Sequence, residues 1–357
     1  MVLAAIVAAG ATLRAQNPIG PPDNVILITL DGARVQEMFG GLDIDILRST
    51  LKKGQAVEDQ PVYRRFWADS PHARREKLMP FFWKTLMPER GSIAGNGSLG
   101  STVRVTNRHR FSYPGYSEIL VGEAHDDAIK SNDPIRNPNV TVLETVRERL
   151  SLPPARVATV ASWAHFNAIA EHVEGATFIN AGREAVAGHG LEPLNAWQLD
   201  AAPAWDFVRF DVFTFEVAMA HLAAARPRLL YLSFDETDDW AHDGRYDRLL
   251  DAYARTDGYL EKLCAWLESQ SDYRGRTHLL ITTDHGRGRT PSDWRDHGEK
   301  VTGAEDVWIA FVSPAMSRRG EWKNQPPLFS NQIAATVAGW LGVDWNALRP
   351  KAGRPIQ

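Results

Sequence analysis

Acids and an imidazole follow three apolar runs of the sequence, each at the point where the run ends. Asp284-His285-Gly286 follows residues 279–283, Asp31-Gly32 follows Asn24–Leu30, and the acid-rich residues 235–239 follow Leu229–Phe234. Apolar runs with little alternation are typical of strands buried on both faces, and the ends of such strands are where ligands gather. Carboxylates and imidazoles are ligands of zinc and related divalent ions. The pattern therefore predicts a metal site at one edge of a sheet.

Two further stretches supply ligands of the same kind. Asp238 and His242 are four residues apart, so one helical turn would place both side chains on the same face, toward one ion. Asp296-His297-Gly298 lies in a predicted loop that also carries Arg287, Arg289 and Arg295.

A serine that could act as a nucleophile is Ser112, in Phe111-Ser112-Tyr113-Pro114-Gly115. Proline and glycine close behind it predict that a helix begins here, with Ser112 in its first turn near free backbone N–H groups. A serine hydroxyl is a poor nucleophile at neutral pH, but a bound divalent ion lowers its pKa and holds the alkoxide.

Each of these residues also has an ordinary structural interpretation. Asp31 before Gly32 could be a turn residue, Asp238 and Ser112 could cap helices, and His297 could be a solvated loop histidine. All four interpretations would have to hold together for the site to disappear.

The elements that must position these residues alternate along the chain. Alternation of strands with helices predicts an α/β fold with a mostly parallel central sheet covered by helices on both faces. The expected strands are residues 24–30, 156–162, 176–179, 229–234, 279–283 and 307–312, and the expected helices include 33–41, 78–86, 139–150, 207–225, 246–269 and 331–341.

Composition limits the function. The chain has 357 residues, of which 24% are charged, with a net charge of −4, so we expect no nucleic-acid binding. Cys264 is the only cysteine, which excludes an internal disulfide, and its spacing from neighbouring leucines is that of a helix core.

The first residues and the boundaries of the domain can also be predicted. Residues 1–16 are apolar and resemble a signal peptide without a charged start, which favours a periplasmic or secreted protein over a cytoplasmic one; they are too short for a transmembrane anchor. We expect a single catalytic domain over residues 23–345. Insertions at about 43–100 and 162–205 are expected to form a cap that selects the leaving group.

The ordered set Asp31, Ser112, Asp238-x-x-x-His242, Asp284-His285 and His297 resembles the two-metal branch of the alkaline phosphatase superfamily. It is most similar to the nucleotide pyrophosphatase/phosphodiesterase-like and type I phosphodiesterase members. The resemblance runs from Asn24 to the predicted closing helix 331–341. It implies an alkaline phosphatase-like fold and a hydrolase of phosphoric esters that acts on a small-molecule substrate.

Roles follow from the resemblance position by position. Asp238, His242 and His297 would hold one ion, and Asp31, Asp284 and His285 would hold a second ion that also binds the nucleophile Ser112. The ions would be two Zn²⁺, with Mn²⁺ as an alternative, and the reaction would pass through a phosphoserine intermediate. Asn132 is the best match to an asparagine that binds a phosphoryl oxygen.

The chain departs from the family in one place that bears on substrate. Gly115-Tyr116 stands where the phosphodiesterase-like members usually have Asn-His. Ser112-x-Pro114 also faintly resembles the sulfatase signature, but Tyr116 replaces the arginine expected there. A sulfatase, a phosphonate hydrolase, a phosphomutase and a non-catalytic metal-binding relative are the alternatives.

The choice between monoester and diester depends on a cation near the site. A monoesterase must meet an extra negative charge on the phosphoryl group, usually with lysine or arginine. The candidates are Arg34, Arg110, Arg287 and Arg289, each beside a motif, and Arg110 comes first because it is two residues from Ser112. Ordinary surface arginine is the alternative interpretation for each.

Overall fold

The computed structural model describes residues 24–357 apart from 188–189, 204, 315 and 317–318. The predicted signal peptide at 1–16 lies outside the described residues, so export stays a prediction. Among the helices that are described, none is long and apolar enough to cross a membrane.

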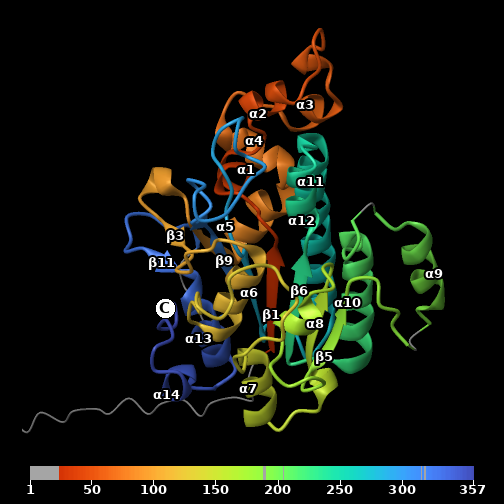
Figure 1. The fold of residues 1–357 in the computed structure, drawn as a ribbon, viewed down its shortest axis with the longest axis vertical. Helices are drawn as coiled ribbons and strands as arrows, with labels where there is room; N and C mark the ends of the chain where they lie inside the picture. The colour runs from red at the N-terminus through yellow and green to blue at the C-terminus, as the bar shows by residue number, and fades with distance from the viewer. Residues whose placement is uncertain (1–23, 188–189, 204, 315, 317–318) are drawn as a thin grey trace, which may run out of the picture.

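A mixed sheet lies at the centre of the molecule (Figure 1). It has eight strands in the order β10-β2-β9-β7-β1-β6-β4-β5. Its strands are β1 (Asn24–Leu30), β2 (Gly91–Ala94), β4 (Val157–Ala161), β5 (Phe178–Ala181), β6 (Leu229–Phe234), β7 (Thr277–Thr282), β9 (Ile309–Val312) and β10 (Gly320–Glu321). The pairings from β7 through β1, β6 and β4 to β5 are all parallel. The predicted, mostly parallel α/β sheet is confirmed.

Two parts of the strand prediction are corrected. The run 307–312 was predicted as one core strand, but it divides at Trp308, and β9 pairs antiparallel with both β7 and β2. Val307 belongs to a separate small sheet, whose strands are β3 (Val103–Arg104), β8 (Asp306–Val307) and β11 (Leu328–Phe329). Apolar runs reveal that a strand is buried, whereas its direction depends on the connection that precedes it.

Helices cover both faces of the sheet. Every residue of β1 is therefore buried, and its alternate side chains enter opposite cores. Ile26 and Ile28 face one core, and Val25 and Leu27 face the other. The first core is covered by α1 (Val35–Gly40), α2 (Ile44–Ser49), α3 (Pro61–Phe66), α4 (Pro71–Leu78), α5 (Met87–Glu89), α10 (Asp211–Ala225), α11 (Glu236–His242) and α12 (Tyr246–Ser269). The second is covered by α6 (Ser112–Val121), α7 (Val142–Arg149), α8 (Phe166–Ile169), α13 (Ile333–Trp340) and α14 (Trp345–Leu348).

The remaining elements are short or peripheral. Helix α9 (Glu192–Asp200) projects to one side of the molecule (Figure 1). One-turn 3₁₀ segments occur at η1 (Val57–Asp59), η3 (Gly97–Leu99), η4 (Pro154–Arg156) and η5 (Ser330–Gln332), and η2 (Phe82–Leu86) is a π-helical turn. The helix predicted over 78–86 is therefore divided, since α4 ends at Leu78 and the chain resumes as η2.

The segment 43–100, predicted as a surface insertion, is partly core. Phe66, Phe82 and Trp83 are buried in the first core, and β2 joins the sheet. At the other end, Ala352 and Ile356 pack in the second core, so the packed unit extends beyond the predicted boundary at residue 345.

Candidate metal and nucleophile site

Three neighbouring parallel strands, β7, β1 and β6, bring the predicted residues to one edge of the sheet. Asp31 follows β1, and Asp284 and His285 follow β7 after one intervening residue, Thr283. Beyond β6, helix α11 carries Asp238 and His242, one turn apart. The carboxyl ends of parallel strands lie at the same edge, so ligands distant in the sequence meet there.

Asp31, Asp284 and His285 form the first ligand group, one of two groups whose atoms are placed so that they could hold a metal ion. All three are buried, and the His285 Nε2 atom lies 3.4 Å from a carboxylate oxygen of each acid. An ion that binds four atoms at about 2.0–2.1 Å in a tetrahedron holds neighbouring ligand atoms about 3.3 Å apart. The spacing in this group therefore fits a zinc ion.

Asp238, His242 and His297 form the second group. The Oδ2 atom of Asp238 lies 3.1 Å from Nε2 of His242, which in turn lies 3.1 Å from Nε2 of His297. The two groups adjoin, because the rings of His285 and His297 stack with centroids 4.1 Å apart. Both ligand sets expected from the resemblance are thus assembled side by side.

Ser112 is the first residue of α6, as predicted, and its side chain points at the first group. Its Oγ lies 3.3 Å from His285 Nε2 and 3.5 Å from Asp31 Oδ1. Phe111 precedes it as a cap without a side-chain hydrogen bond, so the hydroxyl of Ser112 is not used to cap the helix. This argues against the interpretation of Ser112 as a capping residue.

Each carboxylate has one oxygen held by the protein and the other turned toward its ligand group. The Tyr116 hydroxyl donates to Asp31 Oδ2 over 2.8 Å, the Gly32 N–H donates to Asp284 Oδ1 over 3.0 Å, and Arg287 donates to Asp238 Oδ1. The other Asp284 oxygen is buried without a hydrogen-bond partner. Outer hydrogen bonds of this kind orient carboxylates that bind metals.

The two buried imidazoles are oriented in the same way. Nδ1 of His285 bonds the Gly286 carbonyl at 2.9 Å, and Nδ1 of His297 bonds the Arg110 carbonyl at 3.0 Å. A carbonyl only accepts, so Nδ1 carries the proton in both rings and Nε2 is free to bind a metal.

The electrostatics of the two groups call for a cation. Burial and repulsion from neighbouring carboxylates raise the pKa of Asp31, and burial raises that of Asp284, in both cases well above the ordinary value. Burial lowers the pKa of His285 well below its usual range and that of His297 to about 4, so both rings stay neutral. Neutral imidazoles beside buried carboxylates suit a divalent ion, whose positive charge would stabilise the ionised form of the acids.

Asp238 differs from the other two acids. Burial opposes its ionisation, but Arg287, His242 and His297 together outweigh burial and lower the pKa of Asp238 well below its usual value. Its role as an ordinary helix cap is not supported, because Asp238 lies inside α11 and its oxygens face Arg287 and His242.

Asn132 lies beside the start of α6. Its Oδ1 accepts the backbone N–H of Tyr113 over 2.9 Å, which leaves the two amide N–H groups as donors. The residue is half-buried. Its predicted role as a ligand of a phosphoryl oxygen stays a prediction, and this hydrogen bond would orient the amide for it.

The four candidate arginines are all engaged. The guanidinium of Arg110 donates to the Glu299 carbonyl and pairs with Glu305, each at 3.1 Å. The other three pair with acids, namely Arg34 with Glu37, Arg287 with Asp238 and Arg289 with Asp306. Arg34 and Arg287 are also fully buried.

Other predicted residues lie apart from the two groups. Of the acids in 235–239, only Asp238 joins a ligand group, and Asp296 is exposed. Cys264 is buried in α12, and burial raises its pKa to about 11, as expected for an inert core residue.

Sequence reasoning missed the roles of Tyr116 and Thr283 at the site. The Thr283 hydroxyl accepts the N–H of Ala33 and donates to the His285 carbonyl, each at 3.0 Å, and so ties the loop after β7 to the turn after β1. Tyr116 could have been found from its spacing, since it lies one helical turn after Ser112.

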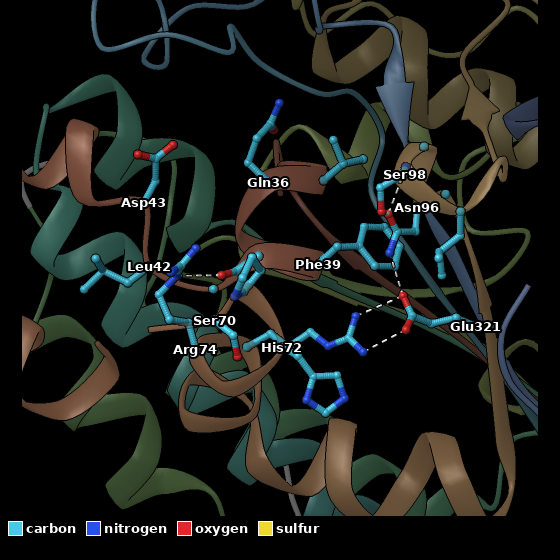
Figure 2. A pocket seen from close by; sticks show the side chains of 18 of the residues that line it. Gln36, Phe39, Leu42, Asp43, Ser70, His72, Arg74, Asn96, Ser98 and Glu321 are labelled. Carbon is cyan, nitrogen blue, oxygen red and sulfur yellow. Dashed lines mark hydrogen bonds and ion pairs between the residues drawn. The ribbon is translucent and has the colours of Figure 1, made fainter. Parts of the chain in front are cut away.

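A cavity of about 720 Å³ lies between α1, α4 and the turn at residues 95–99. Figure 2 shows Asn96 and Glu321 at one side of it, with the Asn96 amide donating to Glu321 over 2.7 Å. None of the ligands, nor Ser112 or Asn132, lines this cavity. Most of its lining comes from the segment 43–100.

Several solved structures share this fold. The structure is similar to the alkaline phosphatase PafA, with a TM-score of 0.60 and 10% identity, over 95% of this chain and 99% of that one. A murine ectonucleotide pyrophosphatase/phosphodiesterase 5 in complex with AMP matches with a TM-score of 0.53 and 11% identity, over 90% and 95%. A phosphonate monoester hydrolase from Silicibacter pomeroyi matches with a TM-score of 0.52 and 12% identity, over 94% and 76%.

The sequence itself matches one family model. Among curated proteins, none matches the chain. The model of the type I phosphodiesterase / nucleotide pyrophosphatase family matches residues 124–330, more than half of the chain. This span includes Asn132 and the candidate metal-binding residues other than Asp31 and Ser112. The fold, which is that of the alkaline phosphatase superfamily, agrees with the match. The chain belongs to the type I phosphodiesterase / nucleotide pyrophosphatase family.

Proposed function

We propose that this protein is a zinc-dependent hydrolase of phosphoric diesters in which Ser112 is the nucleophile. The observation that carries the proposal is the position of the Ser112 hydroxyl, 3.3 Å from His285 Nε2 and 3.5 Å from Asp31 Oδ1. A hydroxyl at that distance from two ligand atoms can share their ion. The family is a metal-dependent hydrolase family, which agrees with this arrangement.

The ligands favour zinc over harder ions. Each group combines carboxylate oxygen with imidazole nitrogen, and the whole site has three imidazoles, a set that suits zinc, with Mn²⁺ as the alternative. Two divalent ions bound there would supply charge stabilisation and a lowered pKa for the serine hydroxyl.

The residues of the chain divide the reaction between them. Ser112 Oγ gives up its proton to solvent and attacks phosphorus, and the bond to the leaving oxygen breaks, with the electron pair going to the leaving group. The serine is left as a phosphate ester, which water then hydrolyses to restore the hydroxyl. The amide N–H groups of Asn132 would donate to a phosphoryl oxygen, whose negative charge grows during attack.

The engaged arginines favour diester over monoester substrates. A monoester brings one more negative charge, which a cation near the site must meet. Among the described residues, the four candidate arginines each already pair with an acid: Glu37, Glu305, Asp238 or Asp306. A diester, with a single negative charge, needs no additional cation.

Turnover of two model esters tests the proposal. Wild-type protein with its zinc content measured should hydrolyse bis-p-nitrophenyl phosphate faster than p-nitrophenyl phosphate. The Ser112→Ala variant should keep its zinc and lose about 10³-fold or more of the activity, equivalent to about 4 kcal/mol. Bound zinc without Ser112-dependent turnover of either ester would contradict a phosphoric ester hydrolase, and turnover confined to sulfate or phosphonate analogues would reassign the substrate.

A further inference from the structure

Gly115 and Tyr116 lie one helical turn beyond Ser112 in α6, and both touch the first ligand group. The contacts of these two residues indicate how the helix is held against that group.

Tyr116 holds the outer oxygen of Asp31. Its side chain is fully buried, and its hydroxyl donates to Asp31 Oδ2 over 2.8 Å, while Oδ1 of the same carboxylate faces Ser112 and His285. The ring is fixed by edge-to-face contact with Phe166, with centroids 4.7 Å apart. One carboxylate oxygen is therefore committed to the tyrosine and the other is presented to an ion.

Gly115 lets α6 approach the other acid of the same group. A Cβ at this position would lie 2.4 Å from the carbonyl oxygen of Asp284 and 2.9 Å from its carbonyl carbon. These are backbone atoms, so a side chain would have to displace either the helix or the strand end. The absence of a side chain at Gly115 thus allows α6 to lie close to the backbone of Asp284.

We infer that Gly115 and Tyr116 are positioning residues that dock the nucleophile helix onto the first ligand group, and that the Tyr116 hydroxyl fixes Asp31 for binding of the ion there. This rests on the proposed function, in that it assigns an ion to Asp31, Asp284 and His285. Ser112 and Tyr116 share one helix, so the element that supplies the nucleophile also orients its metal ligand.

The Tyr116→Phe variant tests the hydroxyl alone, because the ring and its packing are kept. Zinc affinity is measured by competition with a chelator. This measurement gives a separate dissociation constant for each of the two ions and does not depend on enzymatic activity. We expect one of the two ions to bind about 10- to 100-fold more weakly and the other to bind as in wild type. At saturating zinc, kcat should recover in part and KM should stay unchanged.

Tyr231→Phe is the matched control. The Tyr231 hydroxyl is buried in the same layer and bonds Thr29 at 3.1 Å, without a hydrogen bond to any of the six ligands in the part of the chain described. Both ions should bind this variant as in wild type. Equal zinc affinities in wild type and Tyr116→Phe would overturn the inference, as would an equal loss in both tyrosine variants.

A second variant tests the helix position if Tyr116→Phe does not fold. Gly115→Ala should lower kcat at saturating zinc by at least tenfold, because α6 must move away from Asp284; unchanged kcat would overturn this part. Failure of the proposed function looks different: wild-type protein would then bind no zinc, or would bind it without Ser112-dependent turnover.

Discussion

The Nε2 atoms of His242 and His297 lie 3.1 Å apart, with their rings inclined at 62°. His297 cannot donate to His242 through this atom, because its ring is neutral and its proton lies on Nδ1, bonded to the Arg110 carbonyl. A bare nitrogen that faces a second imidazole, which in turn faces Asp238, fits the arrangement of ligands around an ion. The proposed second ion site therefore draws on residues from two distant parts of the chain.

Replacing His297 should remove one ion and spare the other. His297→Ala deletes a ligand of the second group, whereas the first group of Asp31, Asp284 and His285 is unchanged. Zinc content measured by mass spectrometry should fall from two to one per chain. His172→Ala is the control, because its Nδ1 also bonds a carbonyl, that of Asn137, away from the ligands. Two ions retained by His297→Ala would refute the second site.

Removing the metal should destabilise the protein more at pH 8 than at pH 5. Burial raises the pKa of Asp31 and Asp284 in the metal-free fold. Groups with a raised pKa stabilise the fold fully only below their unfolded pKa of about 3.9, and this contribution is lost as the pH rises through the folded pKa. Bound ions offset the charges and cancel the loss.

The measurement is the Tm of zinc-loaded and chelator-treated protein at both pH values. The difference between the two forms should grow with pH, and chelator-treated Asp284→Asn should show a smaller fall in Tm between pH 5 and pH 8. If the Tm difference between the two forms were the same at pH 5 and pH 8, ionisation of Asp31 and Asp284 would not destabilise the metal-free fold, which would contradict the prediction.

Asn132→Asp separates the two proposed uses of the Asn132 amide. The aspartate keeps an oxygen to accept the Tyr113 N–H, so the start of α6 should be preserved. It lacks the donor to the phosphoryl oxygen and adds a negative charge, and loss of a hydrogen bond to a charged group costs about 1.5–3 kcal/mol, or about 10- to 150-fold in kcat/KM. A lower kcat/KM in steady-state kinetics, with an unchanged Tm, would support the role. An unchanged kcat/KM would remove Asn132 from the site.

Arg110→Ala should alter diester turnover little. The guanidinium is bound to Glu305 and the Glu299 carbonyl, whereas the backbone carbonyl that holds His297 remains in the variant. We expect KM for a diester to change by less than about threefold, because the guanidinium is already bound to protein groups and a partly exposed ion pair contributes only about 0–1 kcal/mol. An increase of tenfold or more would mean that Arg110 leaves Glu305 to bind phosphate.

Much of the site could be predicted because its ligands follow strands with strong apolar patterns. The bounds of β1, β6 and α12, the start of α6 at Ser112, and the pairing of Asp238 with His242 all follow from local patterns. The long-range contacts could not be predicted in the same way. The bond from Tyr116 to Asp31 joins residues 85 positions apart, and the antiparallel direction of β9 depends on tertiary packing.

The arginines show the same limit. The position of Arg110 two residues from Ser112 favoured it as a cation that binds phosphate. Its side-chain partner, Glu305, is set by the fold and could not be predicted from that position. The buried position of Arg287 against Asp238 gives it a role in orienting a ligand, which its place in a polar loop did not indicate.

The central claim, that Ser112 attacks phosphorus, is tested most directly by rapid quenching during turnover of bis-p-nitrophenyl phosphate, followed by peptide mass spectrometry. We predict an aryl phosphate ester on Ser112 in wild-type protein and an unmodified peptide in Ser112→Ala. Burst release of p-nitrophenol with no adduct on Ser112, or an adduct on another residue, would contradict the account.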